Sequence, residues 1–169
     1  MSKLFERYHW MLEVIGAIAV VVSLLLVAFE LNESTKATRA ATSSSASQAM
    51  MQWYNEIGVN AEASDVFVRF IQDPDALTQS QRVQGVFMLH AALVVFQNSY
   101  FLAEEGTMDI FTHQTILEAI VPIKDTPGMR LYWEQRKAFF HPRFQEYIES
   151  LFVVERTTSH KLYVKPENE

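Results

Sequence analysis

The sequence contains no cysteine, few turn-forming residues and almost no strand-like pattern, and each shortage narrows what the protein can be. Without cysteine, disulfide bonds, thiolate metal sites and cysteine nucleophiles are excluded. Five glycines and five prolines among 169 residues, with little alternation of polar and apolar positions, are typical of helical proteins. We therefore expect an all-α fold.

The chain also lacks a basic surface. Its net charge is −6 at pH 7, and the excess of acidic side chains lies almost wholly after residue 30. A protein that binds nucleic acid needs a basic face to neutralise phosphates. Nucleic acid is therefore not an expected partner.

Sequence motifs for catalysis are missing as well. No glutamate stands three residues before His90, His113, His141 or His160, as a di-iron bundle would need, and there is no nucleophile elbow or phosphate loop. The spacing of Glu105, Asp109 and His113 could place three ligands on one helical face. Gly106 would break that face, so a connecting turn is the favoured interpretation. We expect no cofactor, no metal and no enzymatic activity.

What the sequence does contain is one long apolar run. Between Val14 and Phe29 only Ser23 is polar, and the flanking apolar residues extend the run to about 22 residues, or about 33 Å as a helix. This length matches a bilayer core and predicts a single membrane-spanning helix within residues 1–31. The run is longer than the apolar core of a signal peptide, and the residues after Phe29 form no cleavage site. We therefore expect the segment to be retained as a membrane anchor.

The charges beside this helix and its small residues indicate how it is oriented and packed. Lys3 and Arg7 give a slight preference for a cytoplasmic N-terminus and an external domain. Small side chains allow close helix packing in lipid. The predicted packing residues are Gly16, Ala19 and Ser23.

Residues 32–57 contain no proline or glycine and show a helical repeat of four residues. We interpret them as a long helix that continues from the membrane segment, although a flexible linker is the alternative. The repeat predicts a narrow packing seam that another helix covers, either from this chain or from a neighbouring copy. The seam residues are Ala37, Ala41, Ser45 and Ala49, continued by Trp53 and Ile57.

Residues 58–155 are predicted to form a helical domain, followed by a polar tail at 156–169. Thr78 with Gln81 is a capping-box signal, and Thr126 before Pro127 is a second helix start. The predicted helices cover residues 63–72, 78–104, 109–122, 129–139 and 142–152. Helical periodicity in the second of them predicts a buried face formed by Val83, Val86, Phe87, His90, Leu93, Val94, Gln97, Tyr100 and Phe101.

A set of aromatic, histidine and basic residues in this domain is the candidate surface for a ligand or partner. A histidine on an apolar face is more often a hydrogen-bonded core residue than a ligand, and aromatic residues more often form the core than a pocket. Both interpretations stay open, as does pairing of the basic residues with nearby acids. The candidate residues are His90, Tyr100, Trp133, Arg136 and Phe140.

Two parts of the sequence resemble a known family. IGAIAVVVSLLLVAFELNESTKATRAAT at 15–42, and EEGTMD at 104–109 with TPGMRLYWEQRKAFFHPRFQEYI at 126–148, are similar to a widespread group of functionally uncharacterised short bacterial single-pass membrane proteins. This chain has Glu30 and Glu33 where the group favours glutamine or a basic residue. The resemblance implies the architecture of an anchor plus a small helical domain, with no activity to transfer.

Together these observations predict a non-enzymatic, membrane-anchored helical protein. It would act as a structural or accessory subunit, assembled with copies of itself or with other membrane-protein subunits, and the lipid bilayer would be its first partner. The alternative is a membrane-tethered sensor or carrier that binds a small apolar ligand near His90, Tyr100 and Trp133.

Overall fold

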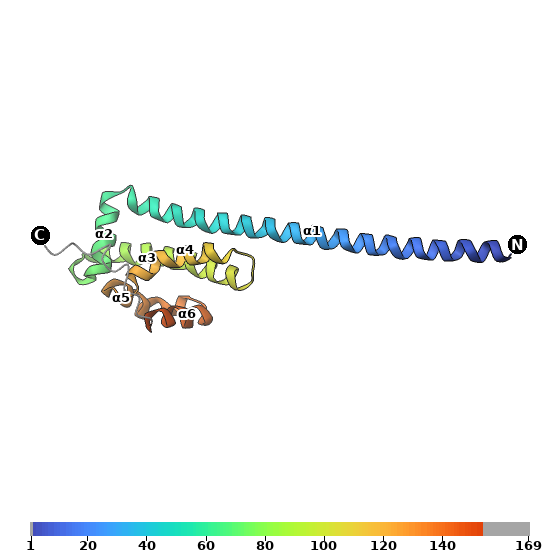
Figure 1. The fold of residues 1–169 in the computed structure, drawn as a ribbon. Helices are drawn as coiled ribbons and strands as arrows, with labels where there is room; N and C mark the ends of the chain where they lie inside the picture. Colours follow the sequence, from blue (N-terminus) through green and yellow to red (C-terminus); the bar gives the residue numbers. More distant parts are fainter. Residues whose placement is uncertain (1, 154–169) are drawn as a thin grey trace, which may run out of the picture. The chain divides into compact units, whose positions relative to one another are not determined.

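The computed structural model describes the backbone of residues 2–153 and the side chains from Tyr8 onward. This part of the chain is helical almost throughout and contains no strand (Figure 1), which confirms the all-α prediction. The polar tail predicted at 156–169 lies outside the described residues. The elements are α1 (Ser2–Gly58), α2 (Ala61–Gln72), η1 (Pro74–Ala76), α3 (Gln79–Glu104), α4 (Ile110–Ile120), η2 (Val121–Ile123), α5 (Pro127–Arg136), η3 (Lys137–Phe139) and α6 (Pro142–Val153).

The chain divides into two compact units, Met1–Arg39 and Ala40–Glu169. The first unit is a single helix, the N-terminal part of α1, and its apolar side chains are exposed along the whole predicted membrane segment. By length and composition this helix could cross a membrane. The predicted long N-terminal helix is therefore confirmed, and it ends at Gly58 as expected.

Four helices of the second unit begin at a residue whose side chain caps the first turn, and the sequence predicts two of these caps, Thr78 and Thr126. The side chain of Asn60 accepts hydrogen bonds from two backbone amides at the start of α2. Thr78 and Gln81 form the predicted capping box of α3. Asp109 caps α4 and Thr126 caps α5, because each side chain accepts a hydrogen bond from a backbone amide of the first turn.

The core of the second unit forms around α3, which packs against α2, α4 and α5 (Figure 1). By length and composition alone, α3 could also cross a membrane. A third of its most apolar stretch is, however, buried in this core. The largest fully buried side chains are Tyr132, Phe70, Phe96, Phe144, Ile71, Leu89 and Leu93.

The predicted buried face of α3 is wrong at three positions. Val83, Phe87 and Val94 are 47%, 60% and 45% exposed, respectively. The helix is apolar on nearly all sides, so its periodicity could not distinguish the core face from the opposite face. The buried positions of α3 are Gly85, Val86, Leu89, Ala92, Leu93, Phe96 and Ser99.

In the C-terminal part of α1, Ala46 and Met50 are buried. Trp53 is half-buried, and its indole Nε1 donates a hydrogen bond of 2.7 Å to the carbonyl oxygen of Met88 in α3. The hydroxyl of Thr42 donates to the carbonyl of Thr107 in the loop before α4. These contacts fix the rotation of the helix in this unit.

The predicted seam lies beside this buried face. Ala49 is half-buried, as are Trp53 and Ile57, whereas Ala37, Ala41 and Ser45 are exposed. The hydroxyl of Thr42 is turned toward the loop, where it bonds the carbonyl of Thr107, and Ala41 and Ser45 are exposed. Packing of these three residues against another chain therefore stays a prediction.

Gly128 offers a direct test of the packing between α5 and α2. A Cβ atom at this position would overlap the carbonyl oxygen of Phe70 and lie 2.8 Å from the Cα of Ile71. Because backbone atoms cannot move aside as a flexible side chain can, we expect Gly128→Ala to destabilise the protein by about 1–3 kcal/mol. Thermal denaturation followed by circular dichroism measures the change.

Gly58→Ala is the matched control, since no atom lies within 4 Å of a Cβ at that position. Its melting temperature should stay close to that of the wild type. Equal melting temperatures for the two variants would contradict the close approach of α5 to α2.

Candidate functional site

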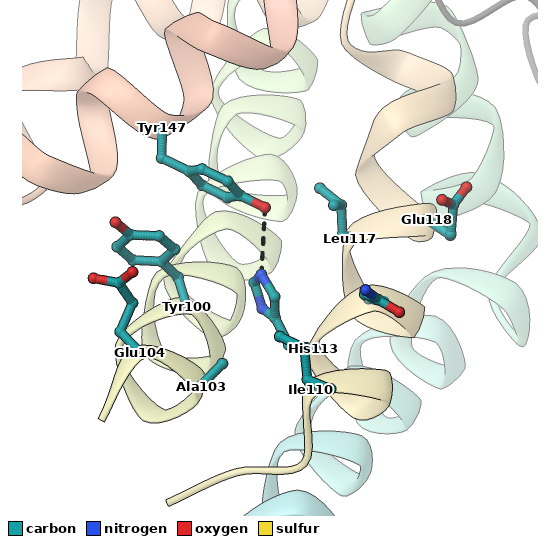
Figure 2. Close-up of a pocket in the computed structure, with 9 residues that line it drawn as sticks. Tyr100, Ala103, Glu104, Ile110, His113, Leu117, Glu118 and Tyr147 are labelled. Carbon is teal, nitrogen blue, oxygen red and sulfur yellow. Dashed lines mark hydrogen bonds between the residues drawn. The ribbon is translucent and has the colours of Figure 1, made fainter. Parts of the chain in front are cut away.

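The second unit contains a cleft of about 420 Å³ with His113 at its centre (Figure 2). The cleft lies between α3 and α4, and Tyr147 of α6 contributes one wall. Its lining combines aromatic, apolar and acidic side chains. These residues are Tyr100, Ala103, Glu104, Ile110, His113, Gln114, Leu117, Glu118 and Tyr147.

His113 is held in place by burial and ring stacking. It stands in the first turn of α4, where the Asp109 cap starts the helix, and only 6% of the residue is exposed. The ring of Phe96 lies parallel to the imidazole within 10°, with 5.6 Å between the ring centroids. Burial lowers the pKa of His113, so the imidazole is neutral at pH 7.

The hydrogen bonds around His113 fit one tautomer well. The hydroxyl of Ser99 lies 2.9 Å from the carbonyl oxygen of Phe96, to which it can donate. Ser99 then accepts the hydrogen bond of 3.1 Å that it shares with Nδ1 of His113, an arrangement in which the imidazole proton is on Nδ1. Nε2 is then an acceptor, and it receives the hydroxyl of Tyr147 at 3.3 Å (Figure 2).

One neutral imidazole thus connects α3, α4 and α6. A buried polar network of this kind stabilises a fold only while each member is satisfied, because an unpaired buried donor or acceptor costs about 1–3 kcal/mol. His113 is therefore a structural connection as well as a lining group of the cleft.

An aromatic stack and an ion pair form one edge of the cleft. The rings of Tyr100 and Tyr147 are stacked with centroids 4.6 Å apart. Glu104 pairs with Arg143, which joins the end of α3 to α6. Burial raises the pKa of Tyr100, and the Glu104 carboxylate raises it further, so the phenol stays protonated.

The arrangement favours binding over nucleophilic catalysis. Ser99 is fully buried and its proton is already committed to a backbone carbonyl. Nε2 of His113, the nitrogen that could act as a base, is hydrogen-bonded to the hydroxyl of Tyr147 instead. What the cleft presents is a hydrogen-bonded floor and walls of aromatic and aliphatic carbon.

The residues of the metal hypothesis do not form a shared face. Gly106 has a φ of 68°, in the left-handed region, and it separates Glu105 from Asp109. The carboxylate of Asp109 accepts the amides of Phe111 and Thr112 as a helix cap. Among the side chains that the structure describes, from Tyr8 to Val153, no group of three or more carboxylates and histidines could hold a metal ion.

The five candidate surface residues are divided between two regions. Tyr100 lines the cleft at His113, whereas His90 and Trp133 both contact Phe140, with ring centroids 5.4 Å and 5.7 Å apart. Arg136 lies over the exposed ring of Phe139 at 5.3 Å. His90, Tyr100 and Trp133 therefore do not line one cavity in the described chain.

His90 has its hydrogen-bond partner in α5. Its Nδ1 lies 2.5 Å from the hydroxyl of Tyr132, and burial raises the pKa of that phenol. The amide oxygen of Gln97 instead accepts the backbone amide of His141, at 2.8 Å. His90 is thus hydrogen-bonded within an aromatic cluster.

The basic residues near the C-terminus form ion pairs, as one of the two sequence interpretations expects. Lys137 pairs with Glu149 at 2.9 Å, and Arg130 pairs with Asp125 at 2.7 Å. Asp125 also pairs with the buried Lys124. Burial works against ionisation of Asp125, but the hydrogen bonds from Lys124 and Arg130 outweigh it and hold the pKa of that carboxyl below its usual range.

Gly16, Ala19 and Ser23 are exposed on the helix of the first unit. The hydroxyl of Ser23 donates to the carbonyl of Ala19 at 2.9 Å, so it is satisfied within the helix. Such a face can contact lipid or a second helix without leaving a polar group unpaired.

Sequence reasoning did not identify Ser99 and Tyr147, and it considered His113 only as a metal ligand. The three residues come from three helices, and nothing in their spacing predicts that they meet. A serine at an inward position of an apolar helix was the one available signal, because a buried hydroxyl needs a partner.

With the geometry described, the chain was compared with protein-family models, curated proteins and solved structures, and no match was found in any of the three comparisons.

The low pKa of His113 makes stability depend on pH. His113 binds a proton more readily in the unfolded chain than in the folded protein, because burial lowers its pKa in the fold. Its contribution to the free energy of unfolding is therefore fully present above the unfolded pKa of about 6.5, and it is lost as the pH falls below that value. We expect the melting temperature in mild detergent to fall between pH 7.5 and 5. The fall should be smaller in His113→Gln, whose amide keeps hydrogen-bonding groups but cannot titrate.

Gln114→Ala is the control, because Gln114 is exposed and lines the same cleft but carries no titratable group. This variant should keep the pH dependence of the wild type. A wild-type slope that survives in His113→Gln would show that another group is responsible.

Proposed function

We propose that this protein is a single-pass membrane protein whose helical domain acts as a structural or accessory subunit of a membrane assembly. The assembly would consist of copies of the chain or of a larger complex that includes it. The observation that carries this proposal is the helix at residues 14–29, whose apolar side chains are exposed without interruption.

The physical basis of the membrane anchor is the free-energy cost of exposing these apolar side chains to water. Leu24, Leu25 and Phe29 are each about two-thirds exposed, within a far longer apolar surface than soluble proteins leave uncovered. A helix satisfies its own backbone hydrogen bonds, so it can enter hydrocarbon at no cost in unpaired groups. A bilayer therefore solvates this segment better than water does.

Location and orientation follow as part of the same proposal. The resemblance to bacterial single-pass proteins supports an inner membrane, and the short basic tail with Lys3 and Arg7 supports a cytoplasmic N-terminus. The helical domain then lies on the opposite side. A reporter enzyme that folds into an active form only in the cytoplasm should be inactive when it is fused after Glu169. Activity of this fusion would contradict the proposed orientation.

The accessory role is supported by the chemistry of the helical domain. The buried Ser99 and His113 and the half-buried Tyr147 form a hydrogen-bonded network, as structural residues do, and Lys137 and Arg143 pair with acids. The exposed small residues Gly16, Ala19 and Ser23 provide a face for association with another membrane helix.

A second candidate function is a tethered sensor or carrier, and the observation in its favour is the His113 cleft. A volume of about 420 Å³ is within the range of small-molecule sites. Ile110 and Leu117 would contact the body of an apolar ligand, and the polar floor would orient it. A monomer in mild detergent whose melting temperature rises when extracted lipids are added would favour this function over assembly.

Charge placed in the predicted span tests the anchor. We expect the double variant Val21→Arg, Leu25→Arg to lose stable insertion, because each arginine at the centre of a membrane helix costs about 2.5–3.5 kcal/mol. The measurement is the fraction of full-length protein that stays in the membrane pellet after alkaline carbonate extraction.

The control variant Ser44→Arg, Gln48→Arg places the same two charges, with the same spacing, at exposed positions of the second unit. This protein should stay in the pellet like the wild type. Release of the wild-type chain by carbonate would overturn the anchor.

A further inference from the structure

The polar groups that line the His113 cleft are mainly hydrogen-bond acceptors. In the arrangement described above, the hydroxyl of Tyr147 gives its proton to Nε2 of His113, so its oxygen can only accept a hydrogen bond from any further group. The carboxylates of Glu104 and Glu118 also accept and do not donate. The side chain of Gln114 adds an amide that can do both. A ligand that complements this lining is therefore rich in hydrogen-bond donors.

The charged residues of the lining are both acids. Glu104 and Glu118 contribute carboxylates on opposite sides of His113 (Figure 2), and no lysine or arginine is among the described residues that line the cleft. Glu104 is engaged by Arg143 of α6 and by the Tyr100 hydroxyl, and Arg143 itself is not a lining residue. Glu118 is exposed on the α4 side. The charge of the lining thus attracts cations and repels anions.

The remaining walls provide carbon surface for an apolar body. Leu117 is buried, and Ile110 is half exposed at the start of α4. The rings of Tyr100 and Tyr147 form the aromatic wall, and the face of an aromatic ring attracts a cation. Ile110 and Glu118 stand eight residues apart in α4, about 12 Å along the helix axis. The cleft is therefore long enough for a ring or a short alkyl chain with a charged end.

We propose that the His113 cleft binds a small organic cation, a protonated amine attached to an aromatic or aliphatic body. The carboxylate of Glu118 would hold the ammonium group, and the body would lie against Leu117 and the tyrosine rings. This inference rests on the second candidate function, a tethered sensor or carrier, and it names the class of ligand for that site.

Other classes of ligand match the lining less well. A wholly apolar molecule would cover carboxylates and a phenol oxygen with carbon, and a polar group that loses water without gaining a hydrogen bond costs free energy. An organic anion would be repelled by the two acids. A metal ion would need three or more ligands, and the described side chains contain no such group. An ammonium group supplies both the charge and the donors.

A matched series of probes tests the preference for a cation. Benzylammonium, benzyl alcohol and benzoate share a phenyl ring and differ in the charge of the polar end. Isothermal titration calorimetry at pH 7.5, with the full-length protein in nanodiscs of a zwitterionic lipid, measures each affinity, and empty nanodiscs give the background. We expect benzylammonium to bind at least about tenfold more tightly than benzyl alcohol, and benzoate to bind most weakly.

Three variants locate the site. Glu118→Gln keeps the shape of the side chain but removes its charge, so it should weaken benzylammonium binding about tenfold and leave benzyl alcohol unchanged. Ile110→Trp would fill the mouth of the cleft and should weaken both probes. Glu134→Gln is the matched control, because it removes the same charge from an exposed position of α5, which contributes no lining residue. This control should leave both affinities unchanged.

The outcomes separate the ligand class from the carrier function. Equal affinities for benzylammonium and benzyl alcohol, both lost in Ile110→Trp, would overturn the cation preference and keep a carrier of neutral ligands. Tighter binding of benzoate would also overturn it. Benzylammonium binding that survives both Glu118→Gln and Ile110→Trp would show that the amine binds elsewhere, so the assignment to this cleft would be wrong. If no probe binds, the ligand class and the carrier function fail together, and the membrane anchor is unaffected.

Discussion

The rest of the structure depends on one constraint. A run of sixteen residues, Val14–Phe29, is apolar except for Ser23 and is exposed on a single helix. In water this surface would cost about 25 cal/mol for each Å² left uncovered, and no other part of the first unit is available to cover it. A helix with all its backbone groups bonded is one of two structures that can enter hydrocarbon. By length and composition the segment could cross a bilayer, and the proposals on location, partner and assembly rest on that property.

The second unit also contains a helix with more apolar surface than one core face can cover, because α3 is apolar on nearly every side. One face of α3 is buried against α2, α4 and α5, where Phe96 and Leu89 fill the core. The opposite face carries Phe87 and Val94 into solvent. His113 adds a polar connection inside this core, since its two nitrogens hold Ser99 of α3 and Tyr147 of α6. The unit is thus fixed internally by one satisfied network while an apolar face stays open.

Local signals predicted most of the fold from the sequence. The Thr78 capping box, the Thr126 cap and the break at Gly106 depend on residues within one turn of each other, and the structure contains all three. The inward face of α3 could not be predicted, because apolar residues on both faces give the periodicity no direction. The hydrogen-bond network around His113 could not be predicted from the sequence either, because only tertiary packing brings residues 99, 113 and 147 together. Candidate residues such as His90 and Trp133 were identified by type, but their partners depend on how α5 meets α3.

The claim on which the other proposals rest is that residues 14–29 cross a bilayer as one helix. Spin labels placed one at a time from Trp10 to Lys36 in the full-length protein, reconstituted in liposomes, would measure their accessibility to oxygen and to a water-soluble nickel complex. A spanning helix predicts that oxygen accessibility rises and nickel accessibility falls toward the middle of the segment, near Val22, with the reverse at both ends. Uniform access of the nickel complex along the whole segment would contradict the account.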